Sequence, residues 1–205
     1  MQKVYRQTQL YKFLSYCEQT QGLSKNILDC GAGGNMPPLA LFQSFGYNPH
    51  GIEISDFNIN RAHKYEQEHG INLNIIKGDM RALPFGDKSM SFVYSYNSIF
   101  HMTKDDIRKS VEEIKRVLAP GGLCFINFLT LQNDEYGIGE EVGEGEFLQD
   151  EGDEKVIHSY HTEAETDMLF EDMKILFKED RVLHRIFEGE MIRQGYIDYI
   201  AQKLK

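Results

Sequence analysis

The stretch at residues 26–35 constrains the fold of this chain more than any other. An apolar segment, residues 26–30, runs into Gly31-Ala32-Gly33-Gly34. This pattern predicts a short buried strand, a tight glycine turn and then a helix beginning near Pro37, because proline is tolerated in a first helical turn. Glycine permits positive φ angles and lets a ligand lie on the backbone. Such a turn also occurs for purely structural reasons, so the downstream residues must decide whether it binds a ligand.

Strands and helices alternate along the chain as far as residue 130. This alternation predicts a parallel sheet with right-handed crossovers, and strands this short and apolar are expected to be buried on both faces. The expected strands are residues 26–30, 50–54, 73–77, 91–95 and 123–129, and the expected helices are residues 3–20, 37–46, 55–69 and 103–118. The apolar face expected of the first helix consists of Val4, Leu10, Tyr11, Leu14 and Cys17.

The alternation stops after residue 130. Residues 162–172 suit one more helix, and residues 174–188 and 193–203 suit two long antiparallel strands, although residues 196–200 also fit a helix. No internal repeat or second domain is found. The chain is expected to be a single domain, 1–205, with an N-terminal helix (1–24), a ligand-binding core (25–130), an acidic loop region (131–161) and a C-terminal helix and hairpin (162–205).

The net charge of −10 is concentrated in one segment. Residues 134–154 contain ten acidic residues, five glycines and no Lys or Arg. Without these ten, 22 acidic residues balance 22 basic ones. Because this segment repels a phosphate backbone, nucleic acid is excluded as an expected partner. The segment lacks a helical or strand period and is expected to be a long loop, which in a compact domain is a functional lid or an insertion.

The rest of the composition predicts a cytoplasmic protein. No apolar run approaches the roughly 20 residues of a membrane span, so no membrane partner is expected. The first residues lack the apolar stretch of a signal peptide. Cys17, Cys30 and Cys124 are far apart, which suits a reducing compartment and predicts neither disulfides nor a zinc site. The oligomeric state is left open.

Two acidic residues follow later strands at informative positions. Glu53 ends the second strand 22 residues after Gly31, which is about the spacing at which a carboxylate meets a ribose diol in a Rossmann-like sheet. Asp79 follows the third strand and can accept a hydrogen bond from the exocyclic amine of adenine. Ile54 and Met80 can sandwich the flat ring. The sequence therefore predicts an adenosine-containing ligand.

Five motifs in the same order resemble the class I S-adenosylmethionine-dependent methyltransferases of the compact small-molecule type. The resemblance covers about residues 25–130 and implies a Rossmann-like, seven-stranded, mainly parallel sheet flanked by helices, with a C-terminal antiparallel hairpin. A third glycine is displaced, leaving Gly34-Asn35, which is a departure from the family pattern. The motifs are Leu28-Asp29-Cys30-Gly31-Ala32-Gly33, Gly51-Ile52-Glu53, Gly78-Asp79-Met80, Phe92-Val93-Tyr94-Ser95 and Leu118-Ala119-Pro120-Gly121-Gly122.

The resemblance also implies a role for each matching residue. The backbone of the glycine turn would contact the methionine part of the cofactor S-adenosylmethionine, and Asp29 would hold its amino group directly or through water. Glu53 would bind the ribose and Asp79 the adenine, while Ser95 and Tyr96 would flank the sulfonium. The cofactor-binding residues predicted in this way are Asp29, Gly31, Ala32, Gly33, Glu53, Ile54, Asp79, Met80, Ser95 and Tyr96.

The catalytic residues are less defined. His101 lies past the fourth strand and, with Tyr96, is a candidate base. A histidine that bonds a nearby backbone group is an equally good interpretation. His158, Tyr160 and His161 cluster after the acidic segment, but their closeness is interpreted as chance, and no metal site is predicted.

The predicted function is methyl transfer to a small-molecule acceptor. A cofactor-binding regulatory module without turnover and a protein methyltransferase are the alternatives. Residues 134–154 directly follow the fifth strand, whose carboxyl end is expected at the ligand crevice. We therefore hypothesise that they form a mobile flap over the acceptor, docked through Tyr136, Phe147 and Leu148.

Overall fold

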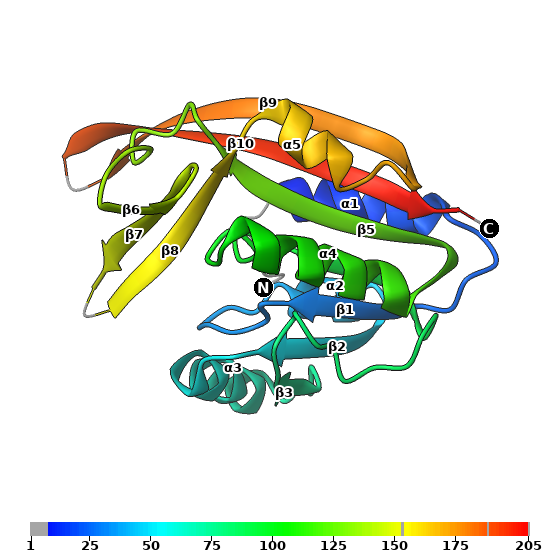
Figure 1. Ribbon diagram of the computed structural model, residues 1–205. Helices are drawn as coiled ribbons and strands as arrows, with labels where there is room; N and C mark the ends of the chain where they lie inside the picture. Colours follow the sequence, from blue (N-terminus) through cyan, green and yellow to red (C-terminus); the bar gives the residue numbers. More distant parts are fainter. Residues whose placement is uncertain (1–7, 153, 188, 205) are drawn as a thin grey trace.

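Five parallel strands form the centre of the computed structural model, which describes residues 8–152, 154–187 and 189–204. Their spatial order is β3-β2-β1-β4-β5, and Figure 1 labels β1, β2, β3 and β5. The order reverses between β1 and β4, and the carboxyl ends of parallel strands open a crevice at such a point. The strands are β1 (Asn26–Cys30), β2 (Asn48–Glu53), β3 (Ile75–Lys77), β4 (Met90–Ser95) and β5 (Leu118–Thr130).

Two long strands extend the sheet to seven. β10 (Glu190–Lys203) pairs antiparallel with both β5 and β9 (Met173–Phe187). The register places Tyr199 opposite Ile126, so residues 196–200 form a strand and not a helix. Glu188, the predicted end of the first of these strands, lies outside the described residues. The predicted mainly parallel sheet with a C-terminal hairpin is confirmed. These seven strands are the predicted ones, and three further strands, described below, bring the sheet to ten.

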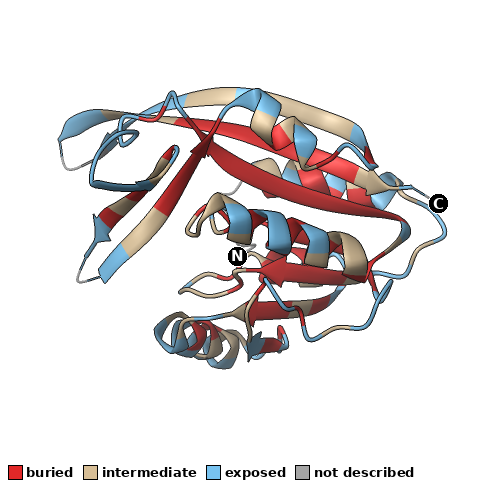
Figure 2. Ribbon diagram, in the orientation of Figure 1, coloured by how far each residue is buried: buried red, intermediate tan, exposed pale blue. Residues whose placement is uncertain are grey.

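Helices cover both faces of the sheet. One apolar cluster joins α1, α2 and α3 to one face through side chains such as Phe13 and Phe42. A second joins α4 and the residues just after α5 to the other face through side chains such as Ile114 and Phe170. Figure 2 shows buried residues concentrated in the strands between these layers. The helices are α1 (Thr8–Gln19), α2 (Leu39–Ser44), α3 (Asp56–His69), α4 (Lys104–Val117) and α5 (Glu163–Met168).

The helix starts follow the predicted capping residues. The hydroxyls of Ser55, Thr103 and Thr162 each accept a hydrogen bond from the backbone N–H three residues later. The first helix differs in part from the prediction. Its residues 3–7, with Val4, lie outside the described residues, and Tyr11 is 36% exposed instead of belonging to the buried face.

The acidic segment is not a structureless loop, which corrects the prediction. It contains β6 (Glu140–Gly143), β7 (Glu146–Glu151) and the start of β8 (Glu154–His161), which form an antiparallel meander at the left of Figure 1. β8 joins the main sheet beside the end of β5. Phe147 is 6% exposed and packs against Tyr136 and Tyr160, so packing on the domain supplies the order that the local sequence did not predict.

Across the described residues, none of the helices combines the length and the apolar character that crossing a membrane requires.

Candidate active site

The glycine turn after β1 packs tightly against neighbouring side chains. Gly31 has a φ of +106°, and both its N–H and that of Ala32 donate to the Ile52 carbonyl. A Cβ on Gly31 would lie 2.1 Å from the Ser98 Oγ, and one on Gly33 would lie 2.6 Å from a Glu53 carboxylate oxygen. Only glycine fits both positions, so the turn exposes bare backbone to the crevice.

Glu53 is fixed at the end of β2 by two backbone donors. Its Oε2 accepts a hydrogen bond of 3.1 Å from the Gly33 N–H, and its Oε1 accepts one of 2.9 Å from the Ser55 N–H. A carboxylate has about four acceptor sites, so two remain for a ligand. The carboxylate therefore faces the crevice in a fixed position and can bind a pair of hydroxyls.

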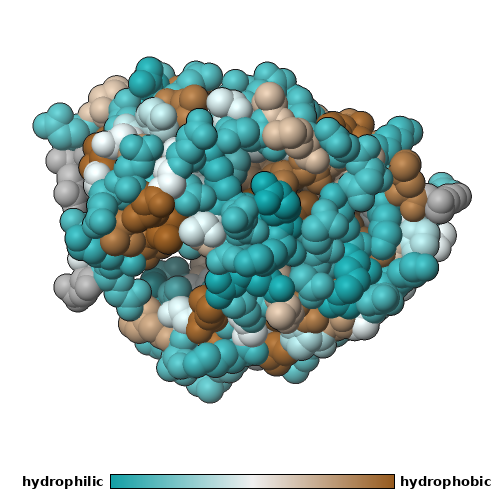
Figure 3. Space-filling model, viewed as in Figure 1, coloured by the Kyte–Doolittle hydropathy of each residue, from teal (hydrophilic) through white to brown (hydrophobic). Residues whose placement is uncertain are grey.

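Two adjoining cavities, of about 560 Å³ and about 150 Å³, lie at the carboxyl ends of the strands. Figure 3 shows this side as largely hydrophilic, with a hollow between the β7–β8 hairpin and the lower part of the molecule. The larger cavity has the glycine turn on one wall and the hairpin residues Glu151, Glu154 and Val156 on another. Seven residues line both cavities: Gly31, Glu53, Ile54, Met80, Ser98, His101 and Met102.

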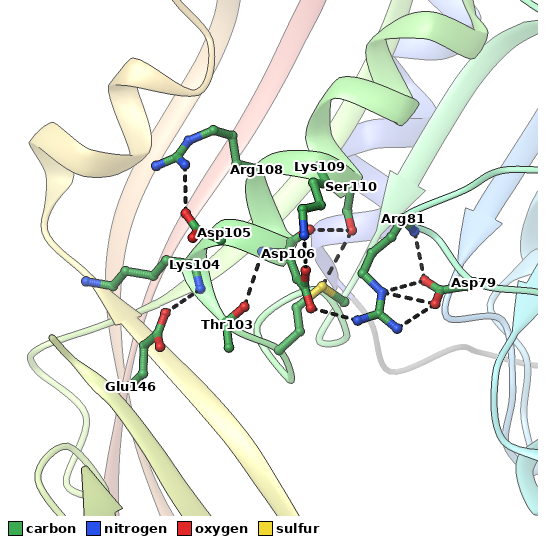
Figure 4. A network of polar contacts seen from close by, with 11 residues as sticks. Asp79, Arg81, Thr103, Lys104, Asp105, Asp106, Arg108, Lys109, Ser110 and Glu146 are labelled. Atoms are coloured by element: carbon green, nitrogen blue, oxygen red, sulfur yellow. Dashed lines mark hydrogen bonds and ion pairs between the residues drawn. The ribbon is translucent and has the colours of Figure 1, made fainter. Parts of the chain in front are cut away.

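Asp79 lines the smaller cavity but already has a strong partner. Its carboxylate accepts hydrogen bonds from the Arg81 guanidinium at 2.6 and 3.0 Å, and Arg81 also reaches Asp106 (Figure 4). The Arg81 guanidinium holds the pKa of Asp79 below its usual range. Ile54 and Met80 line the same cavity, as a sandwich around a flat ring requires.

Three of the predicted cofactor residues do not line either cavity. Ala32 is buried, and the Ser95 hydroxyl donates to the Cys30 carbonyl, which ties β4 to β1. Asp29 is 1% exposed, and its Oδ2 has no hydrogen-bond partner among the described residues. Burial raises the pKa of Asp29 to about 8, the Tyr94 hydroxyl lowers it and the Glu53 charge raises it. A direct contact between Asp29 and a ligand is therefore not formed at the cavity surface.

The raised pKa of Asp29 predicts a pH-dependent loss of stability. Between about pH 4 and pH 8 the unfolded chain releases the Asp29 proton while the folded chain keeps it, so the free energy of unfolding falls as the pH rises through this window. Asp29→Asn removes this contribution. We expect thermal melts to show a stability difference in favour of Asp29→Asn that grows from pH 4 to pH 8 by on the order of a few kcal/mol. A difference that stays constant would contradict a buried, protonated Asp29.

Tyr96 and His101 line the larger cavity, and His101, which also lines the smaller one, lies beside His158. His101, between β4 and α4, lies 3.6 Å from the Glu151 Oε1 through its Nε2, and the His158 Nε2 lies 3.0 Å from the same oxygen. The two imidazole rings are 4.8 Å apart and nearly perpendicular. Burial lowers the pKa of His101 to about 4, Glu151 raises it and His158 lowers it. Tyr96 lines the cavity with its ring against Phe125.

Sequence reasoning did not connect Glu151 and His158 with this site. His158 was grouped with Tyr160 and His161, but Tyr160 donates to Gln149 and His161 packs on Phe128. The contact with His101 depends on how β8 lies beside the preceding loop, which no local pattern reports. The sequence also did not predict that Ser98 lines the cavities. Its packing against Gly31, where any side chain would clash with it, is visible only in the structure.

Comparisons with known proteins agree on the core. A family model described as a methyltransferase domain matches residues 27–122, which run from β1 into β5. A sterol 24-C-methyltransferase from Pneumocystis carinii is 35% identical over 103 residues, covering 48% of this chain and 26% of that protein. A sterol 24-C-methyltransferase from Aspergillus fumigatus is 30% identical over 131 residues, covering 58% of this chain and 34% of that protein. The chain thus spans about a quarter to a third of the length of these relatives.

The fold is also found in solved structures. A SAM-dependent methyltransferase from Methanosarcina mazei superimposes with a TM-score of 0.75, covers 99% of each chain and is 23% identical in sequence. At this identity the likeness concerns the fold. It extends over the hairpin strands and the C-terminal strands as well as the core matched by the family model.

Proposed function

Because the chain belongs to the class I S-adenosylmethionine-dependent methyltransferases, we propose that it transfers a methyl group from S-adenosylmethionine to a small-molecule acceptor. The observation that carries the proposal is the larger cavity. The glycine turn, Glu53, Tyr96 and His101 all line it, as do residues of the β7–β8 hairpin, and its volume of about 560 Å³ leaves room for a cofactor and a second molecule to meet. When bound, the cofactor supplies a methyl group that its sulfonium has already activated.

The residues on the cofactor side fit the parts of this molecule. The bare backbone of Gly31 and Gly33 offers close approach to the methionine part, and the two free acceptor sites of Glu53 suit the ribose hydroxyls. Asp79 accepts from the adenine amine beside its ion pair with Arg81. Asp29 acts through water, because its carboxylate lies behind the cavity surface with one oxygen unpaired.

The residues on the acceptor side orient the nucleophile. We assign Tyr96 and His101 as the catalytic residues, since both line the larger cavity. They hold the acceptor and take up a proton that it loses. The β7–β8 hairpin forms the adjacent wall and excludes water, and positioning with exclusion of water is the main contribution that the protein makes to such a transfer.

The identity of the acceptor is left open by the relatives. The curated relatives are named for sterols, but the family model ends at residue 122, and the hairpin residues Glu151 and Glu154 on the acceptor wall lie beyond it. The acidic segment argues against a nucleic-acid acceptor. We also propose a cytoplasmic location, since the three cysteines are buried and free.

The cofactor assignment predicts a clear order of affinities. We expect S-adenosylmethionine and S-adenosylhomocysteine to bind at one site per chain, and NAD to bind far more weakly, because the pyrophosphate of NAD would be repelled by the carboxylates of Glu53, Glu151 and Glu154 that line the larger cavity. Isothermal titration calorimetry with the three ligands measures this. Tighter binding of NAD would overturn the cofactor assignment.

Turnover is tested by incubating the protein and methyl-labelled cofactor with a metabolite extract and, in parallel, with a protein extract. Label in a small-molecule fraction supports the proposed function. Label in a protein fraction would indicate a protein methyltransferase. Binding of the cofactor with no labelled product in any fraction would indicate a regulatory module without turnover.

A further inference from the structure

His101, Glu151 and His158 bring three possible metal-ligand atoms close together beside the larger cavity. The Nε2 atoms of His101 and His158 both approach the Glu151 Oε1, at 3.6 and 3.0 Å. The ligand atoms of the three residues lie within 4.8 Å of one another. The sequence predicted no metal site, because His101 and Glu151 are 50 positions apart and only the fold brings them together.

These separations match those of a metal coordination sphere. In a tetrahedral zinc site with ligands at about 2.1 Å, the ligand atoms are about 3.4 Å from one another. The two histidine–carboxylate distances lie on either side of this value. The two imidazoles need only a further approach by rotation of their rings, which stand nearly perpendicular at 4.8 Å. Two histidines and one glutamate are also a ligand set found in catalytic zinc sites.

The charge of the group is unbalanced. Within the described parts of the chain, Glu151 forms ion pairs with the two histidines and with no Lys or Arg. Glu154 lines the same wall of the cavity and adds a second negative charge. A divalent cation would supply the positive charge that no Lys or Arg is seen to bring to Glu151 within the described residues.

The backbone around the group holds the ligands in place. The Ser159 N–H donates to the Phe100 carbonyl, and the Ser159 hydroxyl donates to the Met102 carbonyl. These bonds tie β8 to the loop on either side of His101. His158 is 6% exposed, and its Nδ1 has no hydrogen-bond partner among the described residues. Its Nε2 bonds to the Glu151 Oε1 at 3.0 Å, so a metal ion would take the place of the proton between these two atoms, and that proton would move to Nδ1 or to solvent.

We propose that His101, Glu151 and His158 bind a divalent transition-metal ion, with Zn²⁺ as the best match, where the β7–β8 hairpin meets the loop after β4 at the larger cavity. His101 and Glu151 line that cavity, so the remaining coordination position of the ion faces it. The consequence for catalysis rests on the proposed function. An acceptor with a hydroxyl or thiol group binds the ion and loses its proton to solvent, because the charge of the ion lowers the pKa of a coordinated group. In the loaded protein His101 is then a ligand and not the base.

The test is metal binding by the chelator-treated full chain. We expect one Zn²⁺ per chain after dialysis, and visible absorption bands of four-coordinate Co²⁺ on titration with cobalt. Loss of a residue that only hydrogen-bonds to a metal ligand typically lowers metal affinity about 10- to 100-fold. Glu151→Gln removes a ligand itself, so we expect Zn²⁺ affinity to fall by more than about 100-fold. Glu151 is exposed, so this variant is expected to fold, and His184→Gln on the exposed face of β9 is the matched control.

Two outcomes overturn the inference. One is a wild-type protein without cobalt bands, and the other is a Glu151→Gln protein that keeps wild-type Zn²⁺ affinity. Calorimetry with S-adenosylhomocysteine on the metal-free protein separates this result from the proposed function. Cofactor binding without metal binding overturns only the metal site, whereas metal binding without cofactor binding overturns the proposed function and leaves the metal site standing.

Discussion

Glu53→Ala is expected to lower the affinity for S-adenosylmethionine about 10- to 150-fold. A hydrogen bond to a charged acceptor contributes about 1.5–3 kcal/mol, and the ribose hydroxyls would lose that acceptor. Since the carboxylate also accepts from the Gly33 and Ser55 N–H groups, the substitution frees the glycine turn as well. Calorimetry on the purified variant measures the change in affinity.

The structure changes what we expect for the stability of this variant. From the sequence, an acid at the mouth of the crevice adds little to the core, so the melting temperature should stay nearly constant. The two backbone hydrogen bonds of Glu53 instead predict a measurable loss, on the order of 1–3 kcal/mol. Asp56→Ala is the matched control. Asp56 is a nearby exposed acid at the start of α3, and it pairs with Lys77 instead of with the glycine turn. Unchanged cofactor affinity in Glu53→Ala would reduce Glu53 to a structural residue.

The parallel core was predictable because its signals are local. The strand at residues 26–30 is followed directly by its glycine turn, and capping residues such as Ser55 and Thr103 mark helix starts within a few positions. The cofactor side of the site follows from the same signals, since Glu53 and Asp79 come directly after strands. What sequence spacing could not report is depth. Asp29 follows the same rule as Glu53, yet the structure buries it behind the cavity surface.

The acceptor side was not predictable, because its contacts are not local. The strands β6 and β7 have few apolar residues, and glycines and acids hide the alternation that places Phe147 and Gln149 inward. Their order comes from Tyr136 and Tyr160, which lie outside these strands. The contact of His101 with Glu151 likewise requires β8 to join β5 first, so it follows from the topology and not from a motif.

Replacing residues 138–152 with a short glycine linker is expected to lower turnover at least about 100-fold while cofactor affinity changes little. Misplacement of a substrate by about 1 Å can cost this much. The removed residues include Glu151 on the acceptor wall, whereas the glycine turn, Glu53 and Asp79 remain. The hairpin is anchored through the Glu146 carboxylate, which accepts from the Lys104 N–H (Figure 4). Steady-state rates with the acceptor found by the extract screen measure the loss.

The deletion also uncovers Tyr160, which packs on Phe147, so a second pair of variants separates the catalytic effect from stability. Phe147→Ala keeps every residue of the cavity wall but removes the ring that holds β7 on the domain. Val142→Ala on β6 is the control, because Val142 is 46% exposed. We expect Phe147→Ala to lower turnover more than cofactor affinity, and hydrogen exchange to rise in β6 and β7.

If the hairpin opens and closes as a flap, hydrogen exchange in β6 and β7 of the wild-type protein slows when cofactor and acceptor are both bound. A truncated protein that turns over its acceptor at the original rate would show that the acidic segment is a solvated insertion, because then neither positioning nor exclusion of water depends on it.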